Sequence, residues 1–178
     1  MGDGSKTKTS LELVSLGKDA TALCTTLRSE PVSATSSSHQ VLDIMTAQDL
    51  ARRALALYLH FAEQPARARP EGRQALVHLG RVTESVQVVS SELTAALARK
   101  ADNERVAALR NAKPVFVGPS PAQRVAVAAD LLAKVPAECA EGAKWVSAAE
   151  RLQAARDRAA STTPPTPATA STSTPRRR

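Results

Sequence analysis

The amino-acid sequence predicts an all-α protein, an elongated helical bundle of about five helices with disordered N- and C-terminal tails. The stretch VTESVQVVSSELTAALARK, residues 82–100, decides the class. Apolar side chains do not alternate along it, as they would along a half-buried strand. Steps of three and four residues instead select an unbroken apolar row of the kind that an α-helix turns toward a partner, namely Leu79, Val82, Val86, Val89, Leu93 and Ala96.

The composition favours a single slender domain. The chain has 178 residues and is 43% hydrophobic, which suffices for one core but is short for two large domains. It holds only one Trp, one Tyr and two Phe, so Leu, Val and Ala must fill the interior and let the helices approach closely. We expect a disordered N-terminus over residues 1–9, a helical bundle domain over 10–160 and a disordered Ser/Thr/Pro/Arg tail over 161–178.

Two helices are predicted in the first third of the chain. Leucine and alanine recur at steps of three and four over residues 10–28, and the pattern stops before Pro31. A linker rich in small hydroxyl residues follows. Ser37 and Gln40 have the spacing of a capping box, and a second apolar row continues from there until Pro65.

The longest predicted helix starts at Pro70, because proline is favoured in the first turn. It extends toward Ala112, with a break expected near Asp102, where the apolar row loses its phase. The following prolines forbid a helix, and we expect residues 115–117 to form an extended strap across the bundle.

The last two helices are separated by a proline. Ser120 and Gln123 form a second capping box around Pro121, which starts a short fourth helix. This helix is interrupted at Pro136, and a fifth continues to about residue 160. The tail beyond has no apolar residue larger than Ala or Pro and cannot pack, so we expect it to be disordered.

The cysteines indicate an intracellular protein, cytoplasmic or nuclear. Cys24 and Cys139 have no CxxC spacing and follow no secretory leader, so we expect them to be reduced and buried. The sequence contains no apolar run near the roughly 20 residues that span a bilayer, and we expect no transmembrane segment.

No catalytic, metal or cofactor site is predicted. His39, His60 and His78 lie on separate segments, without a carboxylate or cysteine at ligand spacing. The glycines are scattered and form no phosphate-binding loop. We therefore expect a protein that is not an enzyme.

The leading hypothesis is a non-enzymatic interaction subunit or adaptor of a larger protein complex, which binds other subunits through coiled-coil-like helix faces. A helix longer than its neighbours leaves part of its apolar row uncovered for another chain. The candidate interface residues are Leu79, Val82, Val86, Val89 and Leu93. Their pattern suits the core of the chain equally well, and the oligomeric state stays open.

The alternative hypothesis is a basic protein that binds nucleic acid without sequence preference. The formal net charge is +7, to which the three C-terminal arginines contribute three. The candidate basic patch consists of Arg52, Arg53, Arg67, Arg69, Arg73, Arg176, Arg177 and Arg178.

The tail also holds a candidate phosphorylation site. Thr174 precedes Pro175 and the arginines, as in the targets of proline-directed kinases. A phosphate there would reverse the local charge.

Overall fold

The computed structural model describes residues 8–29, 37–109 and 118–161. The all-α class is confirmed, because the described residues form helices and short turns without a strand. In chain order the elements are α1 (Lys8–Ser29), α2 (Ser37–Glu63), the 3-10 helix η1 (Pro65–Ala68), α3 (Pro70–Ala108), α4 (Pro121–Leu132) and α5 (Val135–Ser161).

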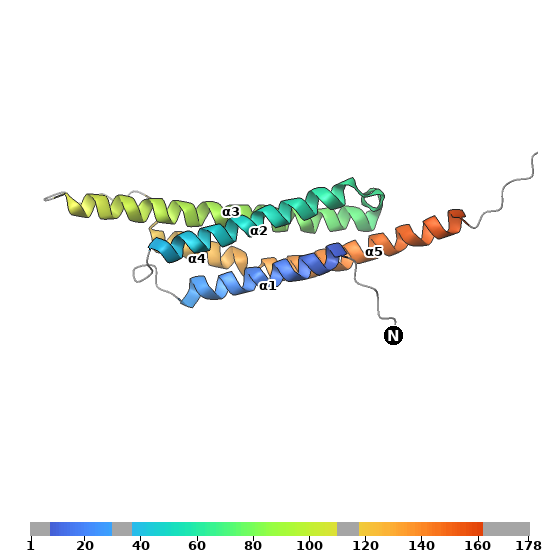
Figure 1. Ribbon diagram of the computed structural model, residues 1–178, viewed down its shortest axis with the longest axis horizontal. Helices are drawn as coiled ribbons and strands as arrows, with labels where there is room; N and C mark the ends of the chain where they lie inside the picture. The colour runs from blue at the N-terminus through green and yellow to red at the C-terminus, as the bar shows by residue number, and fades with distance from the viewer. Residues whose placement is uncertain (1–7, 30–36, 110–117, 162–178) are drawn as a thin grey trace, which may run out of the picture.

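The five α-helices form four rods that run up, down, up and down (Figure 1). Helices α4 and α5 follow one another end to end and make the fourth rod. Within the described residues α1 packs on α2, α4 and α5, and α3 packs on the same three helices, whereas the backbones of α1 and α3 lie diagonally opposite one another and stay apart.

The break between α4 and α5 has a local cause. The amide of Ala133 still donates to the carbonyl of Ala129 at 3.0 Å, but Lys134 shifts to the carbonyl of Leu131 at 3.1 Å. Pro136 has no amide hydrogen to continue the α-helical ladder. The helix therefore ends just before it and restarts with proline in the first turn, where no intrahelical bond is lost.

Three of the helix starts that the sequence predicts are observed, those of α2, α3 and α4. Helix α2 begins at Ser37 and α3 at Pro70. The capping box of α4 is complete, with the amide of Gln123 donating to Ser120 Oγ at 3.2 Å and the amide of Ser120 donating to Gln123 Oε1 at 2.8 Å.

Two expectations about helix boundaries differ from the structure. Helix α1 starts at Lys8, within the segment expected to be disordered. The break expected near Asp102 is wrong, because α3 continues without interruption to Ala108. Its last turns are rich in Ala and Arg, which are good helix formers and favour continuation of the helix. The expected strap at 115–117 lies outside the described residues, as do 1–7 and 162–178.

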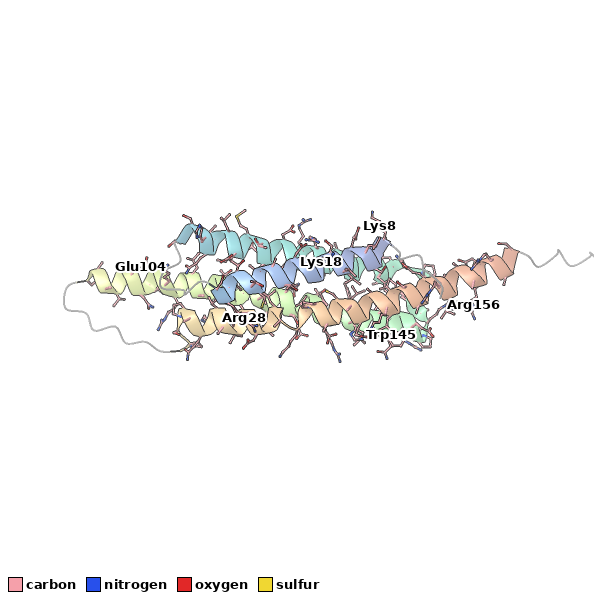
Figure 2. The ribbon with its side chains drawn as sticks, turned by 90° about the horizontal axis from the view of Figure 1, so that it is seen from below. Lys8, Lys18, Arg28, Glu104, Trp145 and Arg156 are labelled. Atoms are coloured by element: carbon pink, nitrogen blue, oxygen red, sulfur yellow. The ribbon has the colours of Figure 1, made fainter. Side chains whose placement is uncertain are left out.

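Two helix ends project from the bundle in opposite directions (Figures 1 and 2). The last buried side chain of α3 is Ala96, and Glu104 lies on the projecting part. The last buried side chain of α5 is Ala149, and Arg156 lies beyond it. The core is confined to the stretch in which all four rods overlap.

Glycine fixes the corner between η1 and α3. A Cβ atom added to Gly72 would lie 2.1 Å from the carbonyl oxygen of Ala66 and 2.7 Å from Cα of Arg67, and neither backbone atom can move freely. Gly80, on the same helix, has no heavy atom nearer than Cε2 of Tyr58 at 3.9 Å. Only the first of these two glycines is required by packing.

We predict opposite effects for the same substitution at these two sites. Gly80→Ala should raise the free energy of unfolding by about 0.5–1 kcal/mol, because alanine is the better helix former. Gly72→Ala should lower it by about 1–3 kcal/mol, because the methyl group overpacks the corner. Denaturant unfolding followed by circular dichroism measures both. Equal effects of the two variants would show that α3 does not pack closely on η1.

Candidate interaction surface

The apolar row predicted on α3 lies in the core. Its side chains are at most 4% exposed and pack with buried residues of the other helices, the members being Leu79, Val82, Val86, Val89 and Leu93. Of the two roles that the sequence leaves open, the structure assigns the core role. The interface assignment is corrected accordingly, since side chains covered by their own chain are not accessible to a partner.

The projecting end of α3 offers little apolar surface. The three-four steps that continue the core row beyond Ala96 reach Lys100 and Asn103, which are polar. Val106 follows on this part of the helix and is half-buried, and Leu109 is exposed just after the helix end. The uncovered end of the longest helix is therefore not the strongest candidate for a contact with another chain.

The outer face of α2 carries the densest exposed apolar surface. Eleven large apolar side chains are exposed among the described residues, and five of them lie on α2. These five are between 39% and 59% exposed and comprise Val41, Leu42, Met45, Leu55 and Leu59. Helix α2 forms one edge of the bundle, with side chains directed away from the other rods (Figure 2).

Four of these five belong to one regular row. Positions 41, 45, 48, 52, 55 and 59 are separated by alternating steps of four and three residues, which is the heptad spacing of a helix that pairs with another helix. Gln48 and Arg52 interrupt the apolar row at its centre. The row lies opposite the face that α2 buries, which includes Leu50, Ala54 and Phe61. We refer to these six positions as the α2 outer row.

Sequence reasoning missed this row because α2 has two periodic faces. The row through Ala47, Ala54 and Phe61 is unbroken and accounts for the helix by itself. The outer row contains two polar residues, and the same sequence pattern also suits an ordinary solvated face. The sequence pattern that could have identified the outer row is a second set of apolar residues at steps of three and four on the same helix.

The predicted basic patch is divided, and its best-placed members are paired. Arg52 donates to Asp49 at 2.6 Å, and Arg53 donates to Asp19 of α1 at 2.7 Å. The hydrogen bond from Arg52 is the main reason that the pKa of Asp49 lies below its ordinary value. Arg67 donates to the carbonyl of Ala62 at 2.6 Å and thereby satisfies the end of α2.

The other arginines of the patch lie elsewhere. Arg69 and Arg73 flank the start of α3, and Arg53 precedes the end of α2 by ten residues, or about 15 Å of helix. Arg176, Arg177, Arg178 and Thr174 lie outside the described residues. The described arginines therefore do not form one continuous cationic surface.

A shallow groove of about 530 Å³ runs between α1 and α2. Lys8, Arg52, Arg53 and His60 contribute to its lining. Lys8 lies 3.9 Å from Glu12, which also lines the groove, and the two arginines have the carboxylate partners described above. The groove is close to charge balance, so it has little excess attraction for an anion.

The titratable groups between helices act as structural links. His78 Nδ1 of α3 lies 2.6 Å from a carboxylate oxygen of Glu138 on α5, and Arg81 lies 3.7 Å from the same carboxylate. Arg124 of α4 pairs with Glu92 of α3 at 2.8 Å. The described residues contain no group of three or more His, Cys, Asp or Glu side chains that could hold a metal ion.

Both cysteines are buried and free. Cys24 donates its thiol hydrogen to the carbonyl of Ala129 on α4 at 3.3 Å. Burial raises the pKa of the Cys139 thiol from 9.0 to about 12, and the negative charge of Glu138 adds to this effect. Such a thiol is protonated at neutral pH and is a poor nucleophile.

Comparison with known proteins finds no relative of this chain. No family model, no curated protein and no solved structure matches it. None of the described helices has a stretch both long and apolar enough to cross a membrane.

The buried thiol predicts a specific alkaline instability. Between pH 9 and about 12 the Cys139 thiol loses its proton in the unfolded chain but keeps it in the folded chain, so the free energy of unfolding falls as the pH rises. Cys139→Ala should unfold more easily at neutral pH, because it leaves a small cavity, but should lose less stability over this interval. Denaturant unfolding at several pH values compares the two proteins. Parallel pH dependences would show that Cys139 does not titrate between the two states.

Proposed function

We propose that this chain is a non-enzymatic interaction subunit or adaptor of a larger intracellular protein complex, and that the α2 outer row is its partner-binding surface. One observation carries the proposal. Large apolar side chains at heptad spacing face solvent along α2, although the same helix already supplies its buried face to the core.

The free energy of such a contact comes from removing apolar surface from water. Each square ångström contributes roughly 25 cal/mol, and contiguous exposed apolar patches mark interaction sites on soluble proteins. Val41 and Met45 lie near the start of the helix, and Leu55 and Leu59 lie near its end. A partner helix laid along α2 would cover both pairs at once.

The polar centre of the row supports a specific contact. Gln48 and Arg52 occupy seam positions between the two apolar pairs. Polar residues at such positions select the register and partner of a helix pair, because a wrong register leaves them opposite apolar groups.

Other side chains bear on the compartment and on the alternative function. The two buried free thiols suit a reducing compartment, as expected for an intracellular protein.

The geometry does not favour the nucleic-acid alternative, because Arg52 and Arg53 are paired with carboxylates. That alternative depends on the tail arginines and stays a prediction.

Site-specific photo-crosslinking in an extract of the source cells tests the proposal. A photoreactive amino acid at position 45 or 59 should give a protein adduct of defined mass, since both side chains are about half-exposed on the α2 outer row. The same amino acid at Lys18, on the exposed side of α1, is the matched control and should give none. Adducts absent at 45 and 59, or equal at all three positions, would contradict the proposal.

A further inference from the structure

The α2 outer row is symmetric along its own length. Val41 and Leu59 are each nine residues from position 50, and Met45 and Leu55 are each five residues from it. Gln48 and Arg52 are each two residues from it. A twofold axis at the level of residue 50 therefore superimposes apolar positions on apolar positions and polar positions on polar ones.

We propose that the occupant of the α2 outer row is α2 of a second copy of this chain, antiparallel and related by that twofold axis. The proposal rests on the proposed function of this face and names its partner. In this register Val41 of one copy lies opposite Leu59 of the other, Met45 opposite Leu55, and Gln48 opposite Arg52. A twofold interface has to be self-complementary in this way.

Charge complementarity favours the antiparallel direction. The side chains of Arg52 and Asp49 are 75% and 47% exposed, so both charges can reach across the interface. Near the axis, Arg52 of each copy approaches Asp49 of the other copy. The Arg52–Asp49 ion pairs of the two copies thereby join into one network in which positive and negative charges alternate. A parallel pair in register would place Arg52 directly against Arg52 and separate the acidic residues.

The register is also specified. A slip of one heptad in the antiparallel pair would set Arg52 opposite Val41 and Gln48 opposite Met45. Each slipped contact would desolvate a polar group without giving it a partner. Only the register centred on residue 50 matches all six positions of the row.

The size of the contact indicates a reversible dimer. The row extends over 19 residues, whose 18 steps of 1.5 Å span about 27 Å, and one helix from each copy forms the interface. Standard stable interfaces bury about 800 Å² per partner, which is more than a single helix face of this length supplies. We therefore expect a dissociation constant on the order of micromolar and an exchange between monomer and dimer.

Sedimentation equilibrium of the purified full chain tests the proposal. The monomer mass is 18.7 kDa, and the apparent mass should rise toward twice this value across the micromolar concentration range. Met45→Glu should raise the dissociation constant at least tenfold, because it sets a carboxylate against Leu55 of the other copy. Val88→Glu replaces a solvent-exposed apolar residue on α3, outside the α2 outer row, and should leave the dimer unchanged.

Cysteine crosslinking tests the direction of the pair. A mixture of Val41→Cys and Leu59→Cys copies should form a disulfide-linked dimer under mild oxidation, whereas either variant alone should not. The native thiols are buried in the core and should not compete. Crosslinking of Val41→Cys with itself would indicate a parallel pair and overturn the antiparallel arrangement.

The outcomes separate this proposal from the proposed function. A monomer at all concentrations, or a dimer that Met45→Glu leaves intact with unchanged helicity, would overturn the second-copy partner. If the purified chain is a monomer while the probe at position 45 captures a different protein, the interaction function stands and the self-association fails. If position 45 gives no adduct of any kind, the interaction function itself fails.

Discussion

The structure depends on the burial of one valine-rich row on α3. Helix α3 packs against α2, η1, α4 and α5, whereas α1 packs only against α2, α4 and α5, so α3 contacts one element more than α1. Valine is a mediocre helix former, since its branched Cβ restricts rotation about χ1. Burial of each such side chain contributes about 1.5–3 kcal/mol, which compensates for the weak local propensity.

Close approach at two glycines and ion pairs near the surface position the other rods around this row. Gly17 and Gly142 let α5 approach α1 and α3 closely, since added Cβ atoms would lie 3.3 Å from Cβ of Cys139 and 3.4 Å from Cβ of His78. Ion pairs such as Arg124 with Glu92 link neighbouring rods near the surface. Helix α2 completes its contacts with one face, which leaves apolar side chains on its opposite face exposed to solvent.

Much of this fold could be predicted from local sequence signals. The three-four row identifies α3 as a helix, and Ser120, Pro121 and Pro136 set the limits of α4 because capping and the missing proline amide act within one turn. The expected break at Asp102 was wrong because a helix of good formers continues without packing. The prediction therefore failed where tertiary contact was assumed to be necessary.

The candidate site could not be predicted in the same way. Whether Val86 faces a core or a partner depends on which other helices cover it, and one periodic pattern serves both cases. The charge balance of Arg53 depends on Asp19, which lies on a different helix. The α2 outer row became evident only once the opposite face of the helix was known to be buried.

Native-state hydrogen exchange tests the central role of the α3 row most directly. The amides of residues 79–93 should exchange only through global unfolding, and their exchange free energy should equal that obtained from denaturant unfolding. The amides at the projecting end of α3 should exchange much faster, because no other rod covers them. If residues 79–93 instead open at a lower free energy than the buried part of α1, the core is not organised around α3.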